Sequence, residues 1–240
     1  MPLAEAAAAL AGAGFAFVRA PQMREALLPA GLADWDGFAA SWGELGLDRY
    51  MADGGRYRRR RFATFAVAPE DGAIRRKPHQ PHYQSRDYNP LNGGIARWFD
   101  PVADAIAAHP ATLSVIGTCN ALFTGLTPPA TRPDVWHVEM HQFRIEARPD
   151  TEGRPTPEGM HRDGVDWVLV LLVRRENVAS GETSIADAAG TALGSFVLTE
   201  PLDAALVDDA LVWHGVTPIR PLDATRLAWR DVLVLTFRRE

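Results

Sequence analysis

Cysteine is almost missing from this sequence, in which Cys119 is the only one among 240 residues. A single thiol excludes an intramolecular disulfide and a cysteine-rich zinc site, and it gives no sign of an oxidising compartment. Positive charge is also scarce, because 25 Lys and Arg stand against 30 Asp and Glu, for a formal net charge of −5. General nucleic-acid binding, which usually requires a basic face, is therefore not expected.

Long apolar runs are absent as well. No stretch of about 18 apolar residues occurs, so we expect no membrane-spanning helix. The apolar stretch 6–10 does not resemble a secretory signal, because Glu5 precedes it and no Lys or Arg comes earlier. We therefore expect a cytoplasmic protein with neither a membrane nor a nucleic acid as partner, while the oligomeric state stays open.

Turn-forming and apolar residues, by contrast, are plentiful. The chain has 18 Pro and 20 Gly, which favours a β-rich architecture over a helical bundle, and 47% apolar residues, which suffices for a sizeable core. Helical patterns occur at 2–13, 21–47 and 95–109. Short β-like runs separated by turn residues occur at 15–18, 56–67, 136–147, 166–174, 182–187, 194–198, 210–216 and 231–237.

These patterns predict an α+β, mainly β fold. Regularly spaced strands are typical of a sandwich or small barrel, and the N-terminal helices would pack on its outside. No linker is visible, so we expect one domain over residues 1–240, with a helical part over about 1–110 and a barrel core over about 111–240. The segment 69–92, rich in polar and turn residues, is predicted to be a long irregular loop.

A candidate metal site lies in the second half of the chain. On a strand, residues two apart point to the same face, so His161 and Asp163 could both reach one ion. His214 ends another apolar run, 51 positions after Asp163 (214 − 163). Two histidines and one carboxylate form the facial triad that holds iron(II) and leaves positions open for substrate and oxygen. The alternative for the first pair is a surface His and Asp beside a turn glycine.

Iron held in this way keeps residual positive charge, which favours an anionic, chelating cosubstrate. Arg230 stands immediately before the last apolar run and, aimed inward, would offer a bidentate fork to a carboxylate. The alternative for Arg230 is a surface ion pair with Asp231 or Glu240. Arg226 is a rival for the cosubstrate role. Thr183 could donate its hydroxyl to the cosubstrate, or simply pack within its strand.

Substrate contacts are predicted on two strands and in the basic run. Arg144 shares a strand face with Gln142, and if that face lines the barrel, Arg144 could grip a substrate carboxylate. A salt bridge with Glu146 is the alternative. Trp167, near the expected metal, could accept an aliphatic side chain. The basic run 58–61 predicts a strand with arginines on both faces, of which one or two could face the substrate.

Two further histidine clusters compete with this site. His137, Glu139 and His141 alternate along one run and would place two imidazoles and a carboxylate on one strand face, as a zinc site requires. Their apolar neighbours favour an ordinary half-buried strand. His79 and His82 stand in a proline-rich loop and are expected to be solvated.

An ordered set of motifs resembles a known family, the double-stranded β-helix 2-oxoglutarate oxygenases, and more closely a bacterial branch that includes L-isoleucine dioxygenase. The motifs are HRDG at 161–164, SGETSI at 180–185, HGVTPI at 214–219 and RDVLVLTF at 230–237. RYRRRRFATF at 56–65 and NPLNGG at 89–94 extend the resemblance over roughly residues 56–237.

The resemblance implies a jelly-roll core, iron(II) as cofactor, and 2-oxoglutarate and O2 as cosubstrates. Family members oxidise unactivated C–H bonds, or the sulfur of methionine, and release succinate and CO2. We therefore expect a small-molecule substrate, a free L-amino acid that is hydroxylated on an aliphatic side chain or oxidised at the sulfur of methionine. The alternative is a non-catalytic, cupin-like barrel that binds a small molecule.

Overall fold

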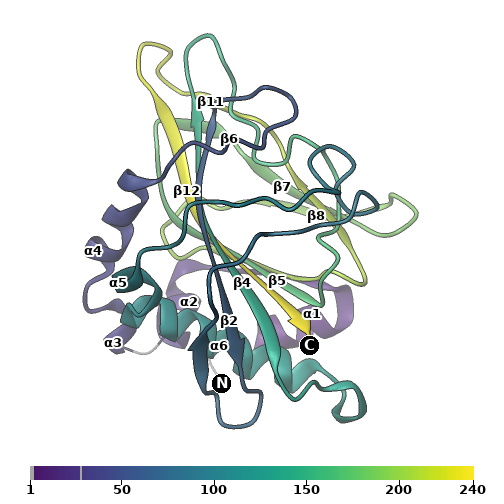
Figure 1. Cartoon of the computed structure of the whole chain (residues 1–240). Coiled ribbons are helices and arrows are strands. Elements are labelled where there is room, and N and C mark those ends of the chain that lie inside the picture. The colour runs from purple at the N-terminus through teal and green to yellow at the C-terminus, as the bar shows by residue number, and fades with distance from the viewer. Residues whose placement is uncertain (1–2, 28) are drawn as a thin grey trace.

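The computed structural model describes residues 3–27 and 29–240, and within them β-structure forms two layers (Figure 1). The larger layer is an antiparallel sheet with the spatial order β1 (Phe15–Val18), β9 (Ala204–Asp208), β5 (Trp167–Glu176), β12 (Ala228–Arg239), β4 (Trp136–Ala147), β2 (Arg58–Val67) and β3 (Ile74–Arg76). The smaller layer contains a sheet ordered β10 (Trp213–Val216), β7 (Glu182–Ala186) and β8 (Ala192–Val197), and the pair β11 (Ile219–Pro221) and β6 (Val178–Ser180). The layers pack through apolar side chains such as Val168 of β5 and Ile185 of β7.

The helices gather on the side of the large sheet that faces away from the small layer (Figure 1). They are α1 (Ala4–Ala13), α2 (Ala20–Ala26), α3 (Pro29–Leu32), α4 (Trp35–Ala40), the 3₁₀-helix η1 (Ser41–Glu44), α5 (Asp104–Ala107), α6 (Pro110–Leu126) and the 3₁₀-helix η2 (Pro129–Thr131). The buried indole N–H of Trp42 donates to the carbonyls of Phe143 and Val232, which ties η1 to β4 and β12. No helix within the described residues is long and apolar enough to cross a membrane.

Side chains alternate along the central strand β12, so its two faces contact different layers. Leu233, Leu235 and Phe237 are fully buried in the core between the large sheet and the helices. Val232 and Val234 point the other way, toward the small layer. The same alternation in β4 and β5 decides which of their residues reach the space between the two layers.

Two antiparallel layers with helices outside confirm the predicted mainly β, double-stranded β-helix fold class. The expected division near residue 110 differs from the observed one. The strands β1 and β2 lie before that point and belong to the large sheet, while the long helix α6 begins there and belongs to the helical layer. Elements distant in sequence therefore build each layer.

The predicted helix over 95–109 is wrong for most of its length. The backbone of Phe62 in β2 accepts from the amide of Val102 at 3.0 Å and donates to the carbonyl of Asp100 at 2.9 Å, which holds this segment extended. Pro101 between them has no amide hydrogen to contribute to a helix. Helix α6 was not predicted from its sequence, because it is buried around much of its circumference and lacks a clear apolar stripe.

Candidate metal centre and cavity

The structure brings His161, Asp163 and His214 together, with one potential ligand atom from each within 4.8 Å of the others. The two histidines face each other in a backbone bridge, where each amide donates to the other's carbonyl at 2.9 Å. The Asp163 carboxylate lies 3.7 Å from Nε2 of His161 and 3.5 Å from Nε2 of His214. The three side chains thus converge on one point.

The local geometry that unites His161 and Asp163 is not the predicted one. His161 lies in an isolated bridge to His214 and Asp163 in the turn that follows, so the pair does not share a strand face. The imidazole of His161 donates from Nδ1 to the carbonyl of Gly159 at 3.1 Å. This hydrogen bond commits Nδ1 of His161 as a donor and leaves Nε2, which is directed at the converging point, as the nitrogen that would bind a metal.

Asp209 holds the turn that carries Asp163. Its carboxylate accepts the backbone N–H groups of Asp163, Gly164 and Val165 at 2.9, 2.7 and 3.1 Å. Gly164 has a φ of +80°, a conformation that glycine adopts without strain. Burial and the charge of Asp163 raise the pKa of Asp209. Asp209 stands immediately before the apolar run that ends in His214, so one short segment carries a candidate ligand and also anchors the backbone of Asp163.

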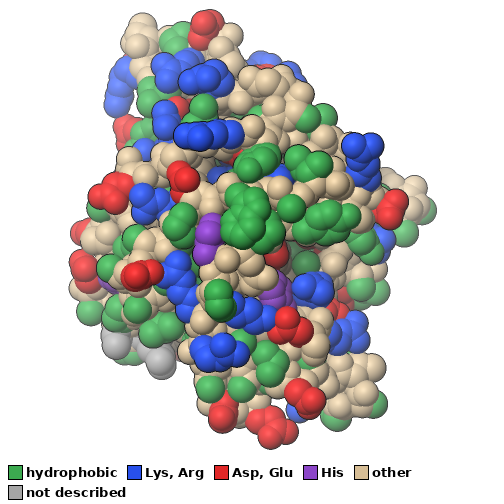
Figure 2. All heavy atoms as spheres, in the orientation of Figure 1, with side chains coloured by type: hydrophobic (Ala, Val, Ile, Leu, Met, Phe, Trp, Pro, Cys, Tyr) green, Lys and Arg blue, Asp and Glu red, His purple; other side chains and the backbone are tan. Residues whose placement is uncertain are grey.

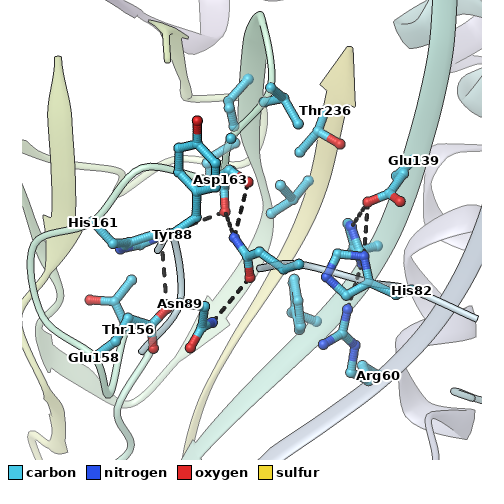
Figure 3. A pocket seen from close by; sticks show the side chains of 18 of the residues that line it. Arg60, His82, Tyr88, Asn89, Glu139, Thr156, Glu158, His161, Asp163 and Thr236 are labelled. Atoms are coloured by element: carbon cyan, nitrogen blue, oxygen red, sulfur yellow. Dashed lines mark hydrogen bonds and ion pairs between the residues drawn. The ribbon is translucent and has the colours of Figure 1, made fainter. Parts of the chain in front are cut away.

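Gln84, from the loop predicted over 69–92, braces the candidate ligand Asp163. Its side-chain amide donates to the Asp163 carbonyl at 3.1 Å and to Oδ1 at 3.4 Å, and it accepts from Asn89 at 3.1 Å (Figure 3). The role of Gln84 was not predicted, because nothing in the sequence of a polar loop indicates which side-chain amide is buried. Its contact with a metal-ligand candidate only arises when the loop folds over the barrel.

A cavity of about 500 Å³ opens at the triad, within the range of about 300–1,000 Å³ typical of small-molecule sites. Part of its wall consists of valines from the loop before β5 and from the strands β5, β10 and β12: Val165, Val168, Val170, Val216, Val232 and Val234. Figure 2 shows histidine side chains near the centre of one face of the molecule, bordered by basic and hydrophobic side chains. The cavity therefore combines an apolar wall with strongly polar ends.

Arg230 lies in the wall of this cavity and is only 2% exposed. Its Nε and Nη2 atoms have no hydrogen-bond partner among the described residues. Burial and the nearby charge of Arg175 lower its pKa to about 10, so the guanidinium is still a cation at neutral pH. The strand begins at Ala228 rather than after Arg230, and alternation turns Arg230 inward.

The rival Arg226 lies outside the cavity. Its side chain is 60% exposed and pairs with Glu176 at 3.0 Å. A surface ion pair, though with Glu176 rather than with Asp231 or Glu240, is thus the role of Arg226 and not of Arg230.

A second histidine cluster lies across the cavity from the triad, around Glu139 (Figure 3). Oε2 of Glu139 lies 2.9 Å from Nδ1 of His82 and 3.5 Å from Nε2 of His141, and Oε1 lies 3.6 Å from Nε2 of His137. Burial favours the neutral acid, but the charges and hydrogen bonds of these histidines outweigh it and hold the pKa of Glu139 well below its usual range. The expectation that His82 is solvated is wrong, because its side chain is buried against Glu139.

Nδ1 of His141 and Nδ1 of His137 each accept a hydrogen bond, which makes these two imidazoles donors to Glu139. Arg60 donates to Nδ1 of His141 at 2.6 Å, and Lys77 donates to Nδ1 of His137 at 2.9 Å. Both Nε2 atoms therefore carry the hydrogen and point it at Glu139. Burial lowers the pKa of His141 to about 3, which keeps this imidazole neutral. Ligand atoms of His82, Glu139 and His141, rather than of the predicted set with His137, lie within 4.8 Å of one another. An ion there would have to displace the hydrogen that Nε2 of His141 directs at Glu139.

The structure does not bring the other predicted contacts to the cavity. Trp167 faces the helical layer, where it stacks on Phe123. Thr183 is buried in β7 but does not line the cavity. Arg144 also points toward the helical layer, because the opposite face of β4, with His141 and its odd-numbered neighbours, lines the cavity.

Arg144 instead forms a bidentate ion pair with the fully buried Asp231 on the neighbouring strand, with both contacts at 2.7 Å. Replacing Arg144 with methionine is therefore expected to lower the free energy of unfolding by about 2–5 kcal/mol, because the buried carboxylate loses its bidentate partner and keeps only the more exposed Arg174, at 3.5 Å. Urea unfolding measures this loss. The control Arg148→Met removes an arginine that is 63% exposed and should change stability by less than about 0.5 kcal/mol. Unchanged stability with weaker substrate binding would instead place Arg144 in the cavity.

The arginines of the run 58–61 lie on both faces of strand β2, as predicted. Arg58 and Arg60 line the cavity and share the buried carboxylate of Asp48, at 2.8 and 3.6 Å. Arg59 pairs outside the cavity with Glu146 at 2.7 Å. Arg97 and Glu158 are among the cavity residues that were not predicted from the sequence.

The fold and the site together define a double-stranded β-helix protein with a His-Asp-His facial triad. Residues 39–236 match the family described as 2OG-Fe dioxygenase, and the chain belongs to that family. Iron(II), 2-oxoglutarate and O2 are the cofactor and cosubstrates of this family, as predicted.

Two curated relatives confirm the resemblance to the L-isoleucine dioxygenase-like branch. L-isoleucine-4-hydroxylase of Bacillus thuringiensis is 27% identical over 157 residues, which are 65% of this chain and 64% of the relative. 3(1)-hydroxy-L-isoleucine 4-dioxygenase of Pantoea ananatis (strain AJ13355) is 23% identical over 173 residues, 71% of this chain and 68% of the relative. The match to the first thus spans less than two thirds of that relative's length.

Solved structures show the same fold. A BsmA homologue from Methylobium petroleophilum PM1 is 37% identical with a TM-score of 0.88, over 98% of this chain and 92% of that one. IDO from Bacillus thuringiensis superimposes with a TM-score of 0.80 at 18% identity, over 98% of each chain, a likeness that concerns the fold alone.

Proposed function

We propose that this chain, as one catalytic domain over residues 1–240, is a 2-oxoglutarate-dependent iron(II) dioxygenase that hydroxylates a free L-amino acid with an aliphatic side chain. Methionine sulfoxidation is proposed as a side activity. One observation carries the proposal: the buried guanidinium of Arg230, whose Nε and Nη2 have no hydrogen-bond partner in the described part of the chain, faces the cavity that also holds the triad. A non-catalytic barrel has no physical reason to bury an unpaired cation beside three potential metal ligands.

The donor set of His161, Asp163 and His214 fits iron(II), since two imidazoles and one carboxylate on one side of a cavity form a facial triad. The hydrogen bond from His161 to Gly159 would orient its ring for the metal. When bound, iron with 2-oxoglutarate supplies the oxidation, in which one atom of O2 enters the substrate and the other enters succinate as CO2 leaves. The protein's own part is to hold and orient the reactants.

Arg230 would bind the distal carboxylate of 2-oxoglutarate. Its two free N–H positions match the two oxygens of a carboxylate, and burial strengthens such a charge-assisted pair. Val232 and Val234 continue the same face of β12 from Arg230 and would cover the methylene groups of the cosubstrate. The cosubstrate would thereby span the distance between the arginine and the metal.

A small amino acid with an aliphatic side chain fits the rest of the cavity. The valine wall offers apolar contact, and the cavity ends carry charges of both signs, such as Arg60 and Glu139. The names of the two curated relatives refer to L-isoleucine and to a hydroxy-L-isoleucine, which are aliphatic amino acids of this size.

The test is a screen of the purified protein with iron(II), ascorbate and 2-oxoglutarate against each free amino acid, with succinate and product mass as the measured quantities. We expect succinate to form together with a product one oxygen heavier than isoleucine, leucine or methionine. Omission of iron(II) and omission of the amino acid are the controls, and each should lower succinate to background. Oxidation of other molecules only would contradict the substrate class, and no 2-oxoglutarate turnover under any condition would contradict the enzyme.

A further inference from the structure

The cavity contains a buried guanidinium that the metal and 2-oxoglutarate would leave without a partner. Arg97 is 2% exposed, and its Nε has no hydrogen-bond partner among the described residues. Its only side-chain hydrogen bond is a long one of 3.5 Å to Gln84, and no ion pair within the described chain reaches it. Arg58 and Arg60, by contrast, share the carboxylate of Asp48. A buried cation without a partner is unfavourable, so an anion is expected beside Arg97 when the cavity is filled.

A carboxylate in the same cavity is similarly uncommitted. The side chain of Glu158 is 8% exposed, and its Oε2 is buried without a hydrogen-bond partner among the described residues. Its Oε1 lies 3.8 Å from Nε2 of His161, so Glu158 adjoins the metal centre (Figure 3). Glu139, across the cavity, differs because both of its oxygens face histidine nitrogens. Glu158 is therefore the carboxylate with a free acceptor.

Arg97 and Glu158 line the same cavity without touching each other. Burial lowers the pKa of Arg97, and the charges of Asp48 and Glu158 are among those that oppose this effect. No ion pair joins Arg97 to Glu158 among the described residues, so their charged ends are separated by more than a direct contact. A molecule that carries both an anionic and a cationic group close together would satisfy the two at once.

We infer that Arg97 and Glu158 form the subsite for the two charged groups of the amino-acid substrate, with the α-carboxylate on Arg97 and the α-ammonium on Glu158. The inference rests on the proposed function and adds the residues that select a free amino acid. The guanidinium offers a fork to a carboxylate. The free Oε2 of Glu158 offers an acceptor to an ammonium group. The aliphatic side chain would then lie along the valine wall.

This subsite explains why free amino acids would be preferred over their derivatives. An N-acylated amino acid lacks the α-ammonium and would leave Glu158 buried without a cation, and every residue of a peptide lacks at least one of the two charged groups. An ester or amide lacks the α-carboxylate and would leave Arg97 without an anion. A site built around buried charged groups rejects an analogue that lacks the matching group much more strongly than an apolar pocket does.

The experiment compares three ligands that differ by one charged group: L-isoleucine, its deaminated analogue 3-methylpentanoic acid, and its decarboxylated analogue 2-methylbutylamine. Binding to protein loaded with iron(II) and 2-oxoglutarate is measured by calorimetry under nitrogen. Glu158→Gln should weaken L-isoleucine binding about 10–100-fold and leave binding of 3-methylpentanoic acid within about twofold. Arg97→Gln should show the reciprocal pattern, with weaker L-isoleucine binding of the same order and unchanged binding of 2-methylbutylamine.

Matched controls come from the same two loops. Glu152→Gln removes a partly exposed carboxylate that pairs with Arg154 and Arg220 outside the cavity, and Arg86→Gln removes an exposed arginine. Both controls should bind all three ligands as the unmodified protein does. The rise in Tm on adding 2-oxoglutarate with iron(II) under nitrogen shows for each variant whether the metal centre is still formed.

Two results would overturn the subsite. One is an equal loss of affinity for L-isoleucine and for 3-methylpentanoic acid in the Glu158→Gln variant, which would mean that Glu158 supports the metal centre instead. The other is a selective loss for the ammonium-bearing ligands in Glu139→Gln rather than in Glu158→Gln. Because binding is measured without turnover, these results are independent of the amino-acid screen. Selective binding without oxidation would contradict only the proposed reaction, and oxidation without charge selectivity would contradict only the subsite.

Discussion

Replacing His214 with alanine is expected to lower 2-oxoglutarate turnover by more than about 100-fold, because removal of a metal ligand should exceed the 10–100-fold effect of removing a partner that only orients a ligand. His214 supplies one of the three ligand atoms that lie within 4.8 Å of one another. The two remaining ligands would hold iron(II) weakly. The measurements are succinate formation and the iron retained after dialysis.

A matched control distinguishes the effect of losing a metal ligand from the effect of replacing a histidine elsewhere in the chain. His79 lies in the loop before the cavity and does not line it, so His79→Ala should retain iron and turnover. Asp163→Asn provides a second test of the triad, because it keeps the shape of the side chain while removing its charge. If His214→Ala retains iron as tightly as the unmodified protein, the assignment of the triad is wrong.

Replacing Arg230 with glutamine is expected to weaken 2-oxoglutarate binding by at least about 30-fold, since removing one partner of a buried charge pair costs about 2–5 kcal/mol. Without cosubstrate, the guanidinium is a buried cation with two unpaired N–H positions. The variant without cosubstrate should therefore be at least as stable as the unmodified protein, because it no longer buries that charge. The predicted signature is an unchanged or higher Tm alone and a lost rise in Tm on adding 2-oxoglutarate with iron(II) under nitrogen.

Two further variants define the role of the fork. Arg230→Lys keeps the positive charge but loses the planar pair of donors, so its affinity for 2-oxoglutarate should lie between the glutamine variant and the unmodified protein. Arg226→Gln removes an exposed arginine that pairs with Glu176, and it should bind the cosubstrate normally. Weaker cosubstrate binding in Arg226→Gln with normal binding in Arg230→Gln would reverse the assignment.

Much of the architecture could be predicted from periodicity. The run from Trp136 to Ala147 is a strand with the predicted bounds, and the runs after it form most of the remaining strands. Alternation and turn residues are local properties, which is why they can be read along the chain. The helix expected over 95–109 failed for the opposite reason, because a long-range pairing with Phe62 overrides its local pattern.

The faces of the strands could not be predicted in the same way. Alternation shows that Arg144 and His141 lie on opposite faces of β4, but it does not show which face meets the helices. The helices pack on the face of the large sheet that carries Arg144 and Trp167. The opposite face lines the cavity between the large sheet and the small layer. Choosing between the two faces requires knowing where distant elements pack.

The sequence by itself determined the kinds of chemistry available: a histidine–aspartate pair, a distant histidine after an apolar run, and an arginine at the last strand. The order of these residues is fixed by the covalent chain, so it can be recognised without knowing the fold. Only the tertiary structure decided that Asp209 anchors the segment of Asp163 and that Gln84 braces it. It also decided that Nε of Arg97 and Oε2 of Glu158 are buried in one cavity without a hydrogen-bond partner among the described residues. Burial and hydrogen-bond partnership depend on every element packed around a group, and they can be assigned only when all of those elements are in place.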